Sequence, residues 1–515
     1  MRRLAPVWVA LAVVAWLGFS LGVRRLALPD EGRYVGVSWE MLRSGDWLVP
    51  TLDGLPFFHK PPLFYWLTAS SIAAFGPQAW SGRLASLLGA LLAAMSLYLL
   101  LRRWTDRRVA GWALVILVTQ PFFFIGAQFA NLDMLVAGLI AATIALAANR
   151  VLCLETGAPL SRAALIGAYA SAALGVLAKG LIGIALPVLV LVLWLTVTRR
   201  TRWVLQLLSL PGTLVFVLIA APWFVAMQQR FDGFFRYFFI DQHFHRFALG
   251  GFNNVQPYWF LGVAVAALTL PWFPALWGAW RMRGADCEEP RRLLRVLLWI
   301  WFAAVLVFFS IPASKLIGYA LPALPPLAGL IADRLWGLTA DAAATWRRLR
   351  IVAAVAAGLC AGSVLLVRSM DSRSTELLAH VLAERRSPAD AVVFAGGYYY
   401  DVPFHARLER PVQVVEAWTA LDIATRDNWR KELFDAARFA PERGQAVLVN
   451  RQQFEQALCA NAVTWVFAPR RLPRHYEVLQ RLAPMASTER ASLWRVERSA
   501  CVNREQTPNA GLPGS

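Results

Sequence analysis

Long apolar stretches separated by short charged loops run through the first 370 residues. A helix needs about 20 consecutive apolar residues to cross the hydrocarbon core of a bilayer. The pattern therefore predicts about eleven membrane-spanning helices, or up to thirteen under other divisions of the segment 166–198. The predicted spans lie at roughly 5–23, 80–101, 108–127, 132–150, 164–181, 183–198, 204–226, 257–280, 294–311, 317–335 and 351–368. The shorter apolar stretch near 62–76 predicts a re-entrant or interfacial helix.

The pattern changes after residue 370, where short apolar runs alternate with polar, helix-forming segments. Runs rich in β-branched and aromatic residues are typical of strands, and the longer periodic segments predict helices. The expected strands are Ala391–Gly396, Val412–Glu416 and Ala446–Asn450, and the expected helices are Ser374–Arg386 and Gln452–Leu458. The predicted fold is an all-α polytopic membrane domain over 1–370 and a small α/β domain over 371–515. The tail after about Cys501 is expected to be disordered.

Composition supports a membrane protein and excludes two other classes. Hydrophobic residues make up 58% of the chain and charged residues 16%, with a mean hydropathy of +0.49. These values exclude an ordinary soluble enzyme and a disordered chain. The net charge is +19, yet residues 371–515 hold 19 basic and 17 acidic side chains. The excess of basic residues therefore lies in the first 370 residues, in the loops between the apolar spans. This distribution suits a lipid bilayer and argues against nucleic acid as a partner.

The arginines predict the orientation in the membrane. Arginine clusters fall in alternate loops, which marks those loops as cytoplasmic. The N-terminus is then inside, and an odd number of spans puts residues 371–515 outside, together with outer loops at 24–79 and 227–256. Arg24 and Arg25 are exceptions, because they lie on the predicted outer side. The first span is interpreted as a retained anchor, since no clean signal-peptide cleavage site follows it.

Lysine and histidine are scarce, and their positions are not random. The chain has four lysines, and Lys60, Lys179 and Lys315 lie at predicted outer ends of spans. His59, His243 and His245 fall in the two outer loops. An outward-facing phosphate site explains these cations, whereas the alternative is isolated lysines that reach the membrane interface.

The first outer loop combines acids, cations and aromatic residues beside the membrane. Asp30 and Glu31 stand at the outer end of the first span, close in sequence to Arg33. Carboxylates can act as a base or orient an acceptor, and cations can stabilise a departing phosphate. The loop therefore predicts transfer chemistry on a phosphate-bearing lipid.

These residues resemble a known family, the GT-C membrane glycosyltransferases that use polyprenyl-phosphate sugars. The closest resemblance is to the aminoarabinose transferases of lipid A modification, and protein O-mannosyltransferases are more distant. The resemblance covers about residues 5–335, and its first-loop motifs are the most specific. The motifs are Asp30-Glu31-x-Arg33-Tyr34, Met41-Leu42-x-Ser44-Gly45-Asp46-Trp47, Lys60-Pro61-Pro62-Leu63-x-Tyr65-Trp66, Leu177-Ala178-Lys179-Gly180, Ala221-Pro222-Trp223, Arg236-Tyr237-Phe238-Phe239 and Ser314-Lys315 with Tyr319-x-Leu321-Pro322.

The resemblance implies roles for individual residues. Asp30 matches the catalytic acid of the family and Asp133 its second acidic position, while Glu31 can orient Arg33 or an amine of the substrate. An isolated Asp beside apolar spans is costly, which favours a functional role for Asp133. The expected contacts to phosphate or lipid are Lys60, Arg33, Tyr34, Lys179, Arg246, Lys315 and Tyr319.

One departure from the family concerns a metal. Aminoarabinose transferases usually have an acid directly before Lys-Pro-Pro, where this chain has His59. In the family this position resembles a metal ligand that joins the first loop to a later one. Imidazole can also bind Zn²⁺, which leaves two alternatives open: one divalent metal held by His59, His243 and Asp241, or a different branch without metal.

The resemblance implies an inverting transfer without a nucleotide. A sugar on undecaprenyl phosphate is expected to move to an envelope acceptor at the periplasmic face of the bacterial inner membrane. The favoured reaction is transfer of 4-amino-4-deoxy-L-arabinose to a lipid A phosphate. Protein O-glycosylation and transfer to another envelope glycan are the alternatives within the class. A transporter would have charged residues deep in the spans and an internal repeat, and the sequence shows neither. A non-catalytic sensor would not need the acidic residues and Lys60 of the first loop.

Overall fold

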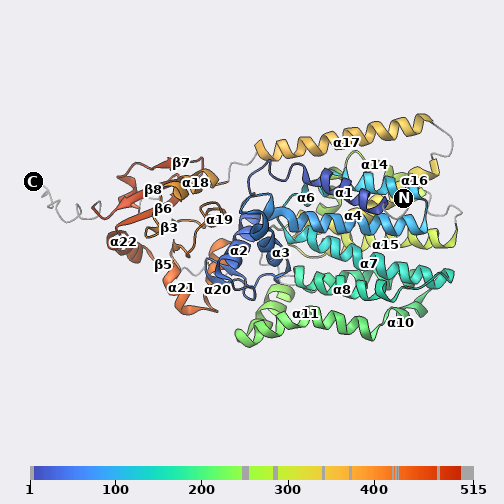
Figure 1. Cartoon of the computed structure of the whole chain (residues 1–515), viewed down its shortest axis with the longest axis horizontal. Coiled ribbons are helices and arrows are strands. Elements are labelled where there is room, and N and C mark those ends of the chain that lie inside the picture. Colours follow the sequence, from blue (N-terminus) through green and yellow to red (C-terminus); the bar gives the residue numbers. More distant parts are fainter. Residues whose placement is uncertain are drawn as a thin grey trace, which may run out of the picture. The chain divides into compact units, whose positions relative to one another are not determined.

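The computed structural model describes the chain except for residues 1–4, 246–253, 282–287, 339–342, 370–373, 420–422, 424–425, 427, 472–475 and 500–515. The chain forms two compact units (Figure 1). Unit 1 comprises Met1–Arg24 and His59–Arg368, and unit 2 comprises Arg25–Phe58 and Ser369–Ser515. The predicted Arg246 and the tail after Cys501 lie outside the described residues.

Helices are the regular elements of unit 1 among its described residues, apart from one isolated bridge between Val255 and Ser314. Its helices are α1 (Ala5–Gly18), α3 (Leu63–Phe75), η1 (Ser81–Arg83), α4 (Leu84–Trp104), α5 (Arg107–Val118), α6 (Pro121–Ala127), α7 (Leu132–Thr156), α8 (Arg162–Lys179), α9 (Ile182–Val197), η2 (Thr201–Trp203), α10 (Val204–Leu207), α11 (Leu210–Arg230), η3 (Arg236–His245), α13 (Phe260–Leu268), α14 (Pro274–Arg281), α15 (Glu289–Ser310), η5 (Ile317–Ala323), α16 (Leu324–Leu338) and α17 (Ala343–Ser369). Each predicted span falls on one helix or on consecutive helices, which confirms an all-α membrane domain.

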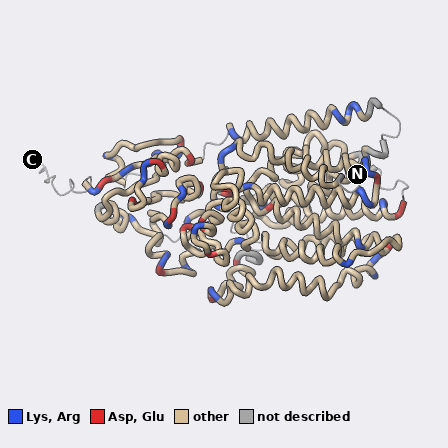
Figure 2. The backbone as a smooth tube through the Cα atoms, viewed as in Figure 1, with Lys and Arg blue, Asp and Glu red and all other residues tan. Residues whose placement is uncertain are grey.

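Several predicted spans are shorter or more broken than the hydropathy pattern suggests. Among the described residues, five helices are long and apolar enough to cross a membrane. The number is six if α5 and α6, which meet at a bend of 70°, count as one span. The short apolar stretch near 62–76 forms the 13-residue helix α3. Figure 2 shows that charged residues gather near the ends of the long helices, as the arginine pattern predicts.

The interior of unit 1 is held by close helix packing and by buried ion pairs. Helices α4 and α7 approach so closely that a Cβ on Gly138 would overlap the backbone of Gly89. Small residues permit such close packing of membrane helices. At the start of α15, Arg295 donates a 2.6 Å hydrogen bond to Asp333 of α16, and Arg291 donates another of 2.8 Å. These pairs join α15 to α16, which η5 separates in the sequence.

The structure explains the two arginines that depart from the orientation rule. Arg24 is buried in unit 1, where its guanidinium donates to the carbonyl of Gln128 and lies 5.3 Å from the Phe129 ring centroid. Arg25 belongs to unit 2, where it pairs with Glu376 at 3.1 Å. Both side chains therefore serve tertiary contacts.

Unit 2 contains a mixed six-stranded sheet in the order β5-β4-β3-β6-β8-β7. Strands β3, β4, β5 and β6 are parallel, whereas β8 is antiparallel to both β6 and β7. The strands are β3 (Ala391–Ala395), β4 (Gln413–Val415), β5 (Leu448–Val449), β6 (Val463–Pro469), β7 (Ala486–Ser487) and β8 (Ala491–Glu497). The helices of the C-terminal segment are α18 (Glu376–Arg385), α19 (Val402–His405), α20 (Trp429–Ala437), α21 (Pro441–Val447), α22 (Arg451–Ala460) and α23 (Glu477–Gln480). The predicted α/β domain is confirmed.

The segment 25–58 belongs to unit 2 together with the C-terminal residues, whereas the sequence pattern predicts it as part of an outer loop of the domain 1–370. It forms helix α2 (Asp30–Ser44) and the hairpin β1 (Thr51–Leu52) and β2 (Leu55–Pro56). Asp53 and Gly54 turn the hairpin with φ of 56° and 71°, the left-handed values that a two-residue Asp-Gly turn requires. The Asp53 carboxylate accepts the N–H of Val412 at 2.9 Å, and the Trp39 indole donates to the carbonyl of Leu408.

A half-buried glutamate, Glu40, ties α2 to this hairpin. The Glu40 carboxylate accepts hydrogen bonds from the Thr51 hydroxyl at 2.8 Å and from the N–H groups of Asp53 at 2.7 Å and Gly54 at 2.9 Å. Burial raises the pKa of Glu40 to about 7, although these hydrogen bonds oppose the rise. Burial also raises the pKa of Asp53, and the charge of Glu40 adds to that effect.

This raised pKa predicts a pH dependence of the hairpin. Glu40 binds its proton more tightly in the folded state than at its ordinary pKa of 4.5. Its contribution to folding is thus complete below pH 4.5 and is lost as the pH rises through about 7. The full loss is at most about 3 kcal/mol. Hydrogen exchange of residues 51–56, corrected for intrinsic rates, should show lower protection at pH 8 than at pH 5.

The matched control is Glu40→Gln, which keeps the shape of the side chain and removes its titration. The difference between the two pH profiles reports the titration of Glu40 together with its effect on the pKa of Asp53. Identical profiles would contradict the assignment.

Candidate active site

A buried ion pair lies among the helices of unit 1. Asp133 is in the first turn of α7, where the Asn131 side chain caps the helix by accepting the Asp133 N–H at 2.8 Å. Lys179 is the last residue of α8, and its ammonium donates to the Asp133 carboxylate. The Lys179 and Asp133 side chains are 13% and 7% exposed. Both charges sit at favourable helix ends, a carboxylate at an N-terminus and an ammonium at a C-terminus.

The helix η5 completes this cluster. The Lys179 Nζ lies 4.3 Å from the ring centroid of Tyr319, a cation–π contact. The neighbouring Gly318 packs directly against Asp133, so that a Cβ at position 318 would overlap the Asp133 carboxylate. The structure thus brings together three predicted site residues from distant parts of the sequence: Asp133, Lys179 and Tyr319.

The contact at Gly318 gives a prediction. Gly318→Ala should displace the Asp133 carboxylate or η5, because the new methyl group occupies the space of that carboxylate. Overpacking of this kind costs about 1–3 kcal/mol. Thermal unfolding of the purified protein measures the loss. The control is Gly358→Ala in α17, where a Cβ meets no atom within 4 Å. Equal stability of the two variants would contradict the packing argument.

Asp30 and Arg33 lie one helical turn apart on α2 in unit 2. Asp30 is the first residue of α2, and its carboxylate is 3.5 Å from the Arg33 guanidinium. Arg33 also pairs with Glu432 of α20 at 3.2 Å and lies over the ring of Tyr400, 5.1 Å from its centroid. The Tyr400 hydroxyl donates to Glu432 at 2.6 Å. Burial alone lowers the pKa of Arg33, but the charges of Glu432, Tyr400, Tyr34 and Asp30 together outweigh it, so the pKa lies above its ordinary value.

Glu31 and Tyr34 are buried on the same helix. Glu31 is fully buried, and its carboxylate accepts the N–H of Ala27 at 2.8 Å, which fixes the chain that leads into α2. Tyr34 is 9% exposed, and its backbone carbonyl accepts the Ser38 hydroxyl. Glu31 therefore positions the start of the helix that carries Asp30.

The other expected phosphate contacts occupy different parts of unit 1. Lys60 is half-buried and precedes Pro61, Pro62 and helix α3. Lys315 is buried, and its ammonium donates to the carbonyl of Gln256 at 2.8 Å. Its backbone N–H also bonds to the carbonyl of Asn254, so Lys315 fastens the segment that precedes α13.

The predicted metal ligands are described only in part. The His59 ring lies 6.3 Å from that of Tyr237 in η3, the helix that also contains Asp241. The side chain of His243 lies outside the described residues, so the geometry of this set stays a prediction. Among the described side chains, one group has its ligand atoms close enough to hold a metal, and its members are Glu376, His380 and His405.

The family described as dolichyl-phosphate-mannose-protein mannosyltransferase matches residues 59–225. An undecaprenyl phosphate-aminoarabinose arabinosyl transferase of Pseudomonas fluorescens is 32% identical over 316 residues, 60% of this chain and 52% of that protein. One from Enterobacter is 33% identical over 374 residues, 69% of this chain and 65% of that protein. The matches thus span between half and two thirds of these relatives.

A solved structure matches over almost the whole length. The crystal structure of ArnT from Cupriavidus metallidurans bound to undecaprenyl phosphate has a TM-score of 0.78 and 25% identity, covering 96% of this chain and 98% of that one. The apo form of the same protein gives a TM-score of 0.77. The chain has the GT-C fold. The family resemblance inferred from the motifs is therefore confirmed.

Some residues that organise the GT-C chain could not be found from its motifs. Glu432 and Tyr400 hold Arg33, yet they lie more than 360 positions further along the sequence. Glu432 stands in a polar segment without any motif, and Tyr400 closes the run Tyr398-Tyr399-Tyr400. That run of three tyrosines is the feature of the sequence that could have indicated a contact residue here, because consecutive tyrosines are unusual in a loop.

Proposed function

We propose that this chain is an inverting glycosyltransferase that moves a sugar from undecaprenyl phosphate to an envelope acceptor. The observation that carries the proposal is the buried Asp133–Lys179 pair with Tyr319 against it. Ionisable groups inside a membrane domain are costly, and they usually mark a functional site. The arabinosyl transferase relatives and the match to a structure bound to undecaprenyl phosphate support the same donor.

In this reaction the acceptor oxygen attacks the anomeric carbon of the sugar. The bond between that carbon and the phosphate oxygen breaks, and undecaprenyl phosphate leaves with the bonding electrons. Lys179 would stabilise the negative charge of the phosphate, a role that suits an ammonium in a site with little water. Asp133 would hold Lys179 in place until the donor binds.

The proposed substrates are 4-amino-4-deoxy-L-arabinose and a lipid A phosphate, at the periplasmic face of the inner membrane. A phosphate acceptor is already an anion and needs no base. Asp30 would then steer the acceptor or stabilise the positive charge that develops on the sugar. The names of the relatives from Pseudomonas fluorescens and Enterobacter favour this sugar.

Protein O-glycosylation is the second candidate. It is favoured by the match of residues 59–225 to the family described as mannosyltransferases that act on protein. A serine or threonine hydroxyl must lose its proton during attack, so Asp30 would then act as a general base.

Mass spectrometry of lipid A from cells with and without the gene distinguishes the acceptors. An added mass of one aminopentose that depends on Asp30 is the expected result. Unchanged lipid A together with the loss of glycopeptides would replace the lipid acceptor by a protein. Unchanged lipid A, glycopeptides and envelope glycans would overturn the proposed activity.

A further inference from the structure

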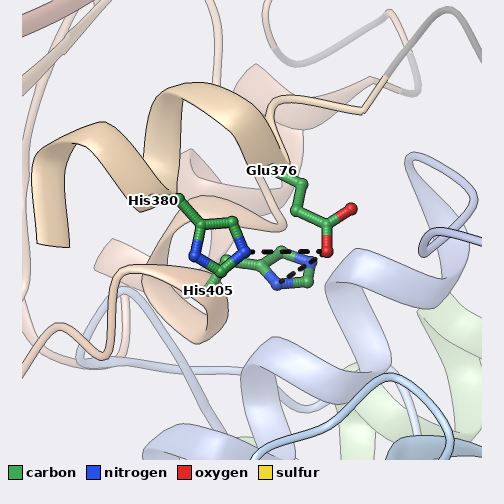
Figure 3. Close-up of side chains that lie close together, drawn as sticks. All are labelled: Glu376, His380 and His405. Atoms are coloured by element: carbon green, nitrogen blue, oxygen red, sulfur yellow. Dashed lines mark ion pairs between the residues drawn. The ribbon is translucent and has the colours of Figure 1, made fainter. Parts of the chain in front are cut away.

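Two histidines and a glutamate converge in unit 2, on elements that the proposed transfer reaction does not use. Glu376 is the first residue of α18, His380 follows one turn later, and His405 ends α19 (Figure 3). The Glu376 Oε1 lies 3.8 Å from the His380 Nε2 and 3.8 Å from the His405 Nδ1. One ligand atom from each residue lies within 4.8 Å of the other two.

These distances suit a metal better than direct hydrogen bonds. A separation of 3.8 Å is too long for an N–H···O hydrogen bond, which spans about 2.7–3.2 Å. In a tetrahedral zinc site with bonds of about 2.0–2.1 Å, neighbouring ligand atoms lie about 3.3 Å apart. Small side-chain rotations would close the group around an ion. His380 is free to make such a rotation, because its side chain is 57% exposed.

A neighbouring ion pair orients the Glu376 carboxylate. The second carboxylate oxygen of Glu376 pairs with Arg25 at 3.1 Å, which leaves Oε1 directed at both imidazoles. Such outer contacts orient metal ligands in known sites. The His405 side chain is 7% exposed and packs edge-on against Phe404, with ring centroids 5.2 Å apart.

The two helices that carry the ligands are also fixed to each other without a metal. The buried carboxylate of Asp401, directly before α19, accepts the Ser374 hydroxyl at 3.1 Å and the Thr375 N–H at 2.8 Å. It also accepts the Thr375 hydroxyl. Because Ser374 and Thr375 directly precede α18, these bonds hold Glu376 and His405 at their observed separation.

We propose that Glu376, His380 and His405 bind a divalent transition-metal ion of the Zn²⁺ class, with water as the remaining ligand. Two imidazoles and one carboxylate are a donor set that zinc sites with an open position use, and nitrogen ligands disfavour Ca²⁺ and Mg²⁺. The ion would join α18 to α19. This site is separate from the one predicted around His59.

The test is the metal content of the full-length protein in detergent. The protein is stripped with a chelator, loaded with Zn²⁺, passed through gel filtration and measured by elemental mass spectrometry. His380→Ala and Glu376→Gln should each bind about one ion per chain less than the wild type. The control is His475→Ala, which removes a histidine that is not a proposed ligand and should keep the wild-type content.

A second readout addresses the coordination itself. Co²⁺ in place of Zn²⁺ should give visible absorption bands in the wild type that weaken in His380→Ala. Since His380 is largely exposed, this variant is expected to fold normally. Unchanged metal content and an unchanged Co²⁺ spectrum in folded His380→Ala would overturn the proposal. A His59→Ala variant should keep the part of the metal content and of the Co²⁺ bands that is lost in His380→Ala, so the two metal sites are distinguishable.

Discussion

Replacing Asp30 by Asn is expected to lower glycosyl transfer about 10³-fold, within the range that loss of one electrostatic contact to the transition state gives. The substitution keeps the shape of the side chain and removes its charge. Asp30 is 41% exposed, and its partner Arg33 retains the closer contact to Glu432. The helix α2 should therefore stay folded while the reaction fails. Turnover of the lipid-linked sugar by the purified variant measures the effect.

Asp46→Asn is the matched control. It makes the same change in the same segment, where the Asp46 carboxylate accepts the N–H groups of Leu48 and Val49. Asn fulfils such a capping role about as well as Asp. Activity near that of the wild type is expected for Asp46→Asn. Equal activity of the two variants would remove Asp30 from the catalytic group.

Lys179→Met is expected to affect both stability and activity. It leaves the Asp133 carboxylate buried without its cation, a change that costs about 3–5 kcal/mol when a buried pair is broken. Loss of a charge that stabilises the leaving phosphate should also lower transfer about 10²–10³-fold. Thermal unfolding and turnover of the same preparation separate the two effects.

The double variant Asp133→Asn/Lys179→Met decides between a structural and a functional pair. Replacing both charges removes the unpaired carboxylate, so most of the lost stability should return. Transfer should stay low, because the cation for the phosphate is still absent. Recovery of activity together with stability would show that the pair serves folding alone.

The helical membrane domain was predictable because its physical cause is local. A bilayer requires each span to satisfy its own backbone hydrogen bonds, so the apolar pattern alone marks the helices. The exact lengths were less predictable. Pro121 begins a new helix after α5 and produces the 70° bend, whereas the hydropathy pattern shows one continuous span at 108–127.

The place of the segment 25–58 was not predictable, because long-range contacts decide it. Trp39 and Asp53 bind backbone groups more than 350 positions away, and no local pattern announces such partners. The strand β6 was not predicted, although its local sequence indicates a strand. Val463–Pro469 is rich in β-branched and aromatic residues and pairs with both β3 and β8.

The candidate site was predictable in its residue types and only partly in its contacts. A lone Asp and a lone Lys in apolar surroundings indicated Asp133 and Lys179 separately, and the structure pairs them across 46 positions. Lys315 was also predicted as a phosphate contact because lysine is scarce in this chain. In the structure its ammonium donates to the carbonyl of Gln256. A scarce cation in a membrane domain thus indicates a buried polar contact, but its type follows only from the fold.

The most direct test of the central claim uses the purified full-length chain in lipid nanodiscs. The chain is supplied with undecaprenyl-phosphate aminoarabinose and lipid A, and both products are measured. We predict transfer of the sugar to lipid A, with release of one undecaprenyl phosphate for each sugar moved and no release by Asp30→Asn. A folded wild-type protein that leaves the lipid-linked donor unchanged with lipid A, peptide and envelope-glycan acceptors alike would contradict the account.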